Sequence, residues 1–143
     1  MGKSIFHLAF PVHNLKSAKA FYVKGLGCRA GRESGHSLIL NLAGHQIVAQ
    51  LTPERPKSQK GIYPRHFGLV FLKRQDWEDV LSRALKKGLP FYQAPKIRFP
   101  KSALEHRTFF LKDPSNNLLE FKHYTHKLAI FGKRGMKKVG DRP

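Results

Sequence analysis

The segments SIFHLAFPV at residues 4–12 and PRHFGLVFL at residues 64–72 decide how this chain folds. Each is an apolar run rich in aromatic and branched side chains, which favours a β-strand. Each also carries one histidine, His7 in the first run and His66 in the second. Two similar strands in equivalent places indicate an internal repeat, so the same elements are expected after each of them.

An amphipathic helix is expected after each of these strands. In residues 13–27 apolar side chains recur at helical spacing, Asn14 can cap the start of the helix and Gly27 can end it. Residues 73–90 repeat the pattern, with Asp76 as the expected cap and a glycine and a proline as the stop. The order of strand and helix therefore occurs twice.

Three short strands are expected after each helix. In the first copy they are GCRAGRE, HSLILNL and HQIVAQL, and in the second LPFYQ, EHRTFFL and NLLEFKHY. A Pro- and Lys-rich loop at 94–104 and a turn at 113–117 separate the strands of the second copy. The chain is thus expected to contain two βαβββ modules, at residues 4–52 and 64–124.

A module of about sixty residues is too small to bury a stable core alone. We therefore expect one α+β domain over residues 1–143, in which the two modules form a cupped mixed sheet around a cavity. Residues 53–63, rich in proline and charge, form the expected linker. Residues 125–143 form a basic C-terminal tail, whose last dozen residues are expected to be frayed.

The composition limits the classes of partner. Of 143 residues, 27 are Lys or Arg and 9 are Asp or Glu, which gives a formal charge of +18 and favours anionic partners. The basic residues are scattered and no nucleic-acid-binding motif accompanies them, so specific nucleic-acid binding is not expected. Cys28, the single cysteine, excludes an internal disulfide, and no apolar stretch has the ~20 residues of a membrane span. The opening MGKSIFHLAF has no secretory apolar core, so a cytoplasmic protein without a membrane partner is expected.

Two histidines and one glutamate are candidate metal ligands. His7 and His66 occupy the same place in the repeat, and each is followed two residues on by a small residue, which leaves room for a ligand. Glu120 lies within the apolar run NLLEF, where an ionised carboxylate is costly unless a cation pairs with it. Two imidazoles and one carboxylate suit a three-ligand site for Fe(II), Mn(II), Zn(II) or Ni(II), although ordinary strand residues would give the same pattern.

Two segments resemble a known superfamily. FHLAFPVHNLKSAKAFYVKGLGC (residues 6–28) and HRTFFLKDPSNNLLEF (residues 106–121), together with the double βαβββ layout, look like the vicinal oxygen chelate superfamily of glyoxalase I, fosfomycin and bleomycin resistance proteins and extradiol dioxygenases. The resemblance implies a divalent metal held by His7, His66 and Glu120. It places Gln50 at a fourth position, which is a glutamate in bacterial glyoxalase I, and it implies modules that pair within one chain or across a homodimer.

The chain departs from these relatives at two positions. Gln50 is a weaker ligand and a poorer proton acceptor than a glutamate, which handicaps glyoxalase chemistry. Phe110 stands where the dioxygenases and fosfomycin transferases have a tyrosine, which argues against catechol substrates. His106, on the same strand face as Phe110, is a candidate catalytic acid or base, and the alternative is a solvent-exposed histidine at the start of a strand.

These observations favour a divalent-metal-dependent enzyme, dioxygenase-like, that acts as a homodimer on a small oxygen-chelating and anionic metabolite. One alternative is a glyoxalase-type lyase or isomerase. Another is a metal-free protein that sequesters a small molecule such as an antibiotic, although the positive charge disfavours a cationic drug.

Overall fold

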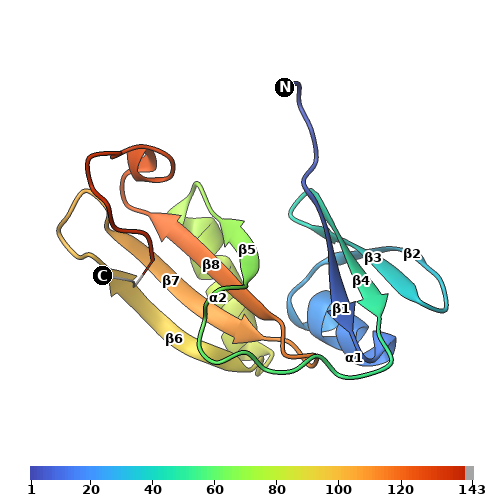
Figure 1. Cartoon of the computed structure of the whole chain (residues 1–143). Helices are drawn as coiled ribbons and strands as arrows, with labels where there is room; N and C mark the ends of the chain where they lie inside the picture. Colours follow the sequence, from blue (N-terminus) through green and yellow to red (C-terminus); the bar gives the residue numbers. More distant parts are fainter. Residues whose placement is uncertain (141–143) are drawn as a thin grey trace.

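Two four-stranded mixed sheets make up the protein in the computed structural model, which describes residues 1–140 (Figure 1). The first sheet has the order β1-β4-β3-β2 and consists of β1 (His7–Val12), β2 (Arg29–Glu33), β3 (Ser37–Leu42) and β4 (His45–Leu51). The second has the order β5-β8-β7-β6 and consists of β5 (Phe67–Val70), β6 (Phe91–Arg98), β7 (His106–Lys112) and β8 (Leu118–Tyr124). In each sheet the first strand pairs in parallel with the last, so the predicted α+β fold with two βαβββ modules is confirmed.

Each module has one principal helix. In the first module α1 (Leu15–Lys19) continues into the π-helical turn η1 (Ala20–Gly25), and Asn14 caps it by accepting the N–H of Ser17 at 2.8 Å. In the second, α2 (Arg74–Lys86) begins after Lys73 and has no side-chain cap. The predicted cap at Asp76 is therefore wrong. Asp76 lies inside the first turn, where its charge favours the helix N-terminus.

One apolar core runs through both modules. On the second sheet α2 packs against one face, where the Trp77 indole N–H donates to the Phe121 carbonyl oxygen at 2.9 Å. The rings of Phe10 in β1 and Phe67 in β5 lie 5.2 Å apart and join the two halves. The cluster includes Tyr22, which is fully buried. The modules are thus held together by shared burial, as their small size requires.

The turn at residues 113–117 also joins the modules. Asp113 accepts the hydroxyl of Tyr22 at 2.7 Å and the backbone N–H groups of Ser115 and Asn117 at 2.8 Å each. The Asn117 amide donates to the Pro11 carbonyl oxygen at 2.8 Å. The predicted turn therefore closes the β7–β8 connection and fixes it against the first module.

The structure corrects the predicted loop at 94–104, because β6 continues as far as Arg98. Pro95 suggested a loop, yet β6 is the outermost strand of its sheet, and its pairing with β7 is irregular between Gln93 and Lys96. A proline is tolerated at such a place since no ladder hydrogen bond is lost there. The extension of β6 brings Arg98 into the candidate site.

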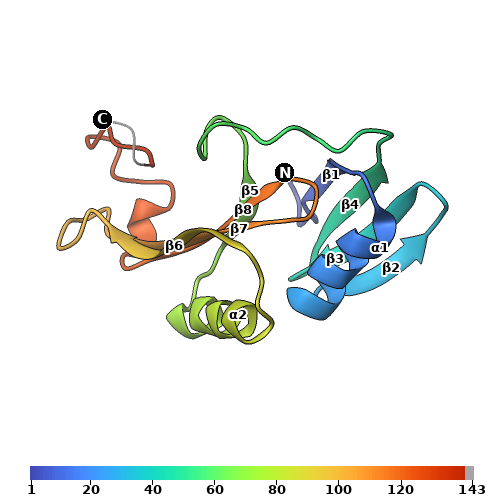
Figure 2. The ribbon, with the colours of Figure 1, turned by 90° about the horizontal axis from the view of Figure 1, so that it is seen from below.

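The C-terminal segment, residues 125–140, folds back onto the second sheet. It contains the 3₁₀ turn η2 (Lys127–Ala129), and the Lys138 ammonium lies 5.5 Å from the centre of the Phe99 ring. Figure 2 shows this segment on one side of the second sheet and α2 on the other. Frayed ends stay a prediction for residues 132–140, which are almost all exposed, and residues 141–143 lie outside the described residues. Among the described residues, no helix is both long and apolar enough to cross a membrane.

Candidate functional site

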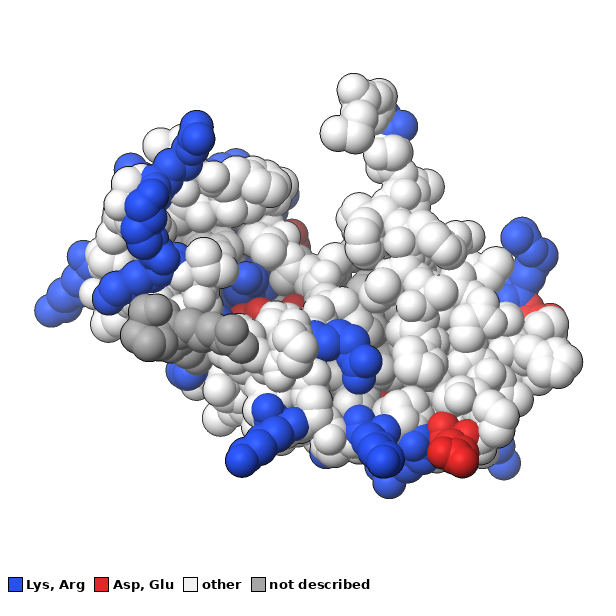
Figure 3. Space-filling model, in the orientation of Figure 1, with Lys and Arg blue, Asp and Glu red and all other residues white. Residues whose placement is uncertain are grey.

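The face of the second sheet opposite α2, which we call the inner face, carries the candidate site. Phe109 and Phe121 point toward α2, because Phe109 contacts the Trp77 ring and Phe121 lies in the same core. Alternation along the strands then directs Thr108, Phe110, Glu120 and Lys122 to the inner face. Figure 3 shows a hollow between the two halves in which acidic and basic side chains lie next to each other.

Glu120 is the centre of the site and is only 5% exposed. Its Oε1 accepts hydrogen bonds from the Thr108 hydroxyl at 2.7 Å and from Arg98 Nη1 at 3.0 Å. Its Oε2 lies 3.0 Å from His66 Nε2 and 3.9 Å from the Lys122 ammonium. The buried carboxylate thus has partners from β6, β7 and β8 and from the residue preceding β5.

These partners keep Glu120 ionised. Burial alone would raise its pKa, but the hydrogen bond from His66, the charge of Lys122, the hydrogen bond from Thr108 and the charge of Arg98 together lower the pKa to about 2. A carboxylate at neutral pH is a hard oxygen donor that can bind a divalent cation.

His66 is oriented toward Glu120 by its own backbone. Its Nδ1 donates to the Ile62 carbonyl oxygen at 2.8 Å, which directs Nε2 at the carboxylate. The hydrogen bond with Glu120 raises the pKa of His66, against the opposing effect of burial. The His66 imidazole and the Phe110 ring are nearly perpendicular, 5.1 Å apart between centroids, so Phe110 packs directly on the candidate ligand.

These two residues fit a divalent metal ion. A metal-binding histidine typically donates its second ring nitrogen to a carbonyl or carboxylate, as His66 does to Ile62. Glu120 keeps Oε2 toward His66 while Oε1 is held by Thr108 and Arg98. His66 Nε2 and Glu120 Oε2 are therefore the two atoms that would hold the ion. A cavity of about 200 Å³, lined by both side chains and by Lys122, adjoins them.

The other two predicted ligands lie elsewhere in the chain. His7 is exposed on β1, and its Nδ1 is 2.7 Å from the side-chain oxygen of Gln46. Gln50 is exposed on β4 and accepts the hydroxyl of Ser37 at 2.5 Å. Within residues 1–140 no three His, Cys, Asp or Glu side chains gather in a way that could hold a metal. The structure brings together two of the four predicted ligands, His66 and Glu120.

His106 lies on β7, two residues before Thr108, and is 3% exposed, so the solvent-exposed alternative is wrong. Its Nδ1 donates to the Leu104 carbonyl oxygen at 2.9 Å. Burial lowers its pKa, opposed by the Leu104 hydrogen bond and assisted by the positive charges of Lys122 and Arg98. At neutral pH His106 is therefore an uncharged imidazole with Nε2 as an acceptor.

Sequence reasoning missed Arg98 as a functional residue. It is 5% exposed, its guanidinium bonds Glu120, and its central carbon lies 5.9 Å from the centre of the Phe110 ring. The available signal was strand alternation, which places Gln93, Pro95 and Ile97 on one face and Lys96 and Arg98 on the other. Pro95 concealed this signal, because proline usually interrupts a strand. Lys122 was recognisable from its strand face, two residues after Glu120.

Comparisons with known proteins agree with this architecture. Residues 4–121 match the model of the Glyoxalase/Bleomycin resistance protein/Dioxygenase superfamily. A solved glyoxalase/bleomycin resistance protein/dioxygenase from Alicyclobacillus acidocaldarius is 40% identical, with a TM-score of 0.85, over 90% of this chain and 96% of that one. The chain therefore belongs to this superfamily.

More distant structures share the fold alone. The fosfomycin resistance protein FosX from Listeria monocytogenes is 16% identical, with a TM-score of 0.69, over 90% of this chain and 99% of that one. Lactoylglutathione lyase from Agrobacterium tumefaciens is 17% identical, with a TM-score of 0.64, over 85% of this chain and 94% of that one. A comparison with curated protein sequences found no match.

Proposed function

We propose that this protein is a divalent-metal-dependent enzyme that acts on a small, oxygen-chelating and anionic metabolite. The observation that carries the proposal is the position of His66 Nε2 and Glu120 Oε2, which lie 3.0 Å apart. The hydrogen bond from His66 Nδ1 to Ile62 orients the imidazole, and the hydrogen bond from Thr108 to Oε1 orients the carboxylate. Superfamily membership supports it, because members commonly use divalent metals. When bound, the metal would act as a Lewis acid on the oxygens of the substrate or, if redox-active, would hold substrate and O₂ side by side.

The chain's own residues would bind and orient the substrate. Lys122 lines the cavity beside Glu120, and its ammonium would attract an anion and stabilise negative charge that develops on it. Phe110 presents an apolar ring and offers no proton there. His106, uncharged on the same face, would accept a proton through Nε2.

His7 would complete the metal site from a second copy of the chain in a homodimer. It is exposed on the first sheet and cannot be assigned to the His66–Glu120 pair within this chain, because no third ligand gathers there among residues 1–140. Two histidines and one carboxylate with open positions are typical of non-haem oxygenase sites, so we place a dioxygenase-like reaction first and a glyoxalase-type lyase or isomerase second. Gln50 pairs with Pro11 in the β1–β4 ladder, four residues along the strand from His7, so His7 is the ligand that we propose from this module.

Elemental analysis of the purified protein tests the metal. We expect about one divalent ion per chain in the wild type and a loss of at least tenfold in metal content in His66→Ala. The exposed His36, which lies outside the candidate site, provides a matched control, and His36→Ala should keep the wild-type content. Equal metal content in wild type and His66→Ala contradicts the proposal.

A second experiment distinguishes the two reaction classes. Oxygen uptake with a candidate substrate would indicate the oxygenase, and turnover of a hemithioacetal would indicate the lyase.

One observation favours a second candidate, a metal-free binding protein. Glu120 already has Arg98 and His66 as partners, so the buried carboxylate is satisfied without an ion. A protein that binds its ligand tightly after exhaustive chelation, with no change on adding metal, would belong to this class.

A further inference from the structure

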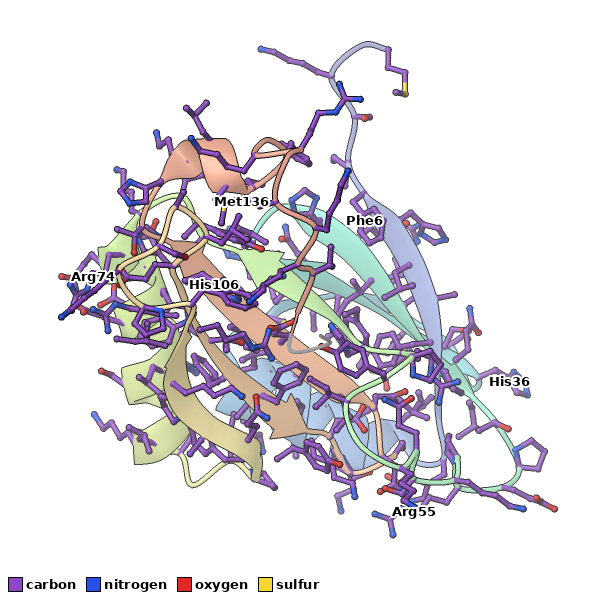
Figure 4. The ribbon with its side chains drawn as sticks, turned by 60° about the vertical axis from the view of Figure 1, so that its left-hand side comes forward. Phe6, His36, Arg55, Arg74, His106 and Met136 are labelled. Atoms are coloured by element: carbon purple, nitrogen blue, oxygen red, sulfur yellow. The ribbon has the colours of Figure 1, made fainter. Side chains whose placement is uncertain are left out.

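A second cavity lies between the C-terminal segment and the inner face of β7 and β8. Its volume is about 270 Å³, which suits a metabolite-sized molecule. His106 and Tyr124 form its floor, and the C-terminal segment from Ala129 to Gly140 forms its roof. Figure 4 shows His106 beneath the segment that carries Met136. The segment reaches the linker, since a Cβ on Gly140 would lie 2.2 Å from the hydroxyl of Tyr63.

The wall of this cavity is cationic. Lys122, Lys133, Arg134 and Lys138 line it, and no Asp or Glu does so among the described residues. The remaining wall is aromatic and aliphatic, with Phe99 and Tyr124 facing the space. Positive side chains beside aromatic and aliphatic ones favour an organic anion more than a hydrated inorganic one.

A residue that lines this space carries a buried polar atom without a partner. His106 is 3% exposed, and its Nε2 has no hydrogen-bond partner among the described residues. Because Nδ1 already donates to the Leu104 carbonyl oxygen, Nε2 can only accept in the neutral ring. A buried acceptor left unpaired carries its full desolvation cost, so a ligand with an O–H or N–H group gains affinity by supplying the donor.

We propose that this cavity binds a small organic anion that carries a hydroxyl or amino group, with the donor on His106 Nε2 and the anionic group between Lys122, Lys133 and Arg134. The inference deepens the proposed function, because it assigns the substrate class, but the cavity does not need the metal. Lys122 lines this cavity and the one beside Glu120, so a ligand held here lies next to the candidate metal site.

Three probes of one shape test the proposal on the full chain. We expect 4-hydroxyphenylacetate, which has an anion and a donor, to bind about tenfold more tightly than phenylacetate or 4-hydroxyphenethyl alcohol, each of which lacks one group. Titration calorimetry gives the affinities. The ¹⁵N resonance of His106 Nε2 should move upfield only with the two probes that carry a hydroxyl. Equal affinities for the three probes, an unshifted His106 resonance or no saturable binding overturns the proposal.

Charge-matched variants distinguish binding in this cavity from general attraction of an anion to a basic surface. Lys133→Gln with Arg134→Gln should weaken 4-hydroxyphenylacetate about tenfold. Lys127→Gln with Lys137→Gln removes the same charge from the same segment outside the cavity and should leave affinity unchanged. Equal weakening in both pairs overturns the proposal. His66→Ala should lose metal and keep the probe, so failure of the metal site and failure of this cavity give different results.

Discussion

A single carboxylate organises the candidate site at the scale of the residue. Glu120 is buried, and its two oxygens are bound on different sides, Oε1 by Thr108 and Arg98 and Oε2 by His66. Removing one partner of such a group leaves a buried charge uncompensated and costs about 3–5 kcal/mol. Its environment therefore makes Glu120 both a structural anchor of the inner face and the strongest candidate ligand.

The pH dependence of stability should report this environment. The native pKa of Glu120 is lowered from 4.5 to about 2, so its contribution is complete above its ordinary pKa and is lost as the pH falls from about 4.5 to about 2. The shift corresponds to stabilisation on the order of 3 kcal/mol. In urea unfolding from pH 7 to pH 2, the free-energy difference between wild type and Glu120→Gln should shrink across this window. A difference that is constant with pH would show that the carboxylate is not specifically stabilised in the folded state.

The sequence predicted His66 and Glu120, the two side chains that meet in the site, and missed Arg98, which binds the Glu120 carboxylate. The repeat identified His66, and the cost of a carboxylate in an apolar strand identified Glu120. Arg98 was assigned to a loop because proline usually interrupts a strand, and only the edge position of β6 makes Pro95 acceptable. Whether His7 reaches the same metal depends on how modules pair, which alternation along a strand does not encode.

At the scale of the element, the parallel pair β5–β8 brings His66 to Glu120. Gly68, two residues after His66, pairs with Glu120 in this ladder. The sequence suggested that a small residue here leaves room for a ligand. In the structure a Cβ on Gly68 would lie 1.7 Å from the backbone oxygen of Glu120, so the glycine is required by the close approach of two backbones.

We expect Gly68→Ala to destabilise the protein by about 2–3 kcal/mol, because β5 must move away from β8 to accept the added carbon. Gly35→Ala is the matched control, since Gly35 is exposed and a Cβ there meets nothing within 4 Å. Its stability should stay within about 0.5 kcal/mol of wild type. Urea denaturation of the three proteins measures both effects. Equal stability of the two variants would mean that β5 is free to shift and does not fix His66.

At the scale of the whole molecule, the two modules divide the proposed ligand set between them. The second sheet carries His66 and Glu120, and the first sheet carries His7 on the exposed part of β1. In a two-fold dimer, the first module of each copy would lie against the inner face of its partner's second module. Each dimer would then hold two equivalent sites, and every site would depend on residues from both chains.

Mixing two inactive variants tests this arrangement. His7→Ala and Glu120→Gln should each lose metal as homodimers, because both sites of each homodimer lack one ligand. Unfolding them together and refolding the mixture should restore about a quarter of the wild-type metal content, since about half of the dimers are mixed and each mixed dimer has one intact site of two. His66→Ala mixed with Glu120→Gln is the control, because these two ligands come from the same module and no combination makes an intact site. If the first mixture binds no more metal than its separate components, His7 does not act across a dimer, and the metal must be completed by another residue or by solvent.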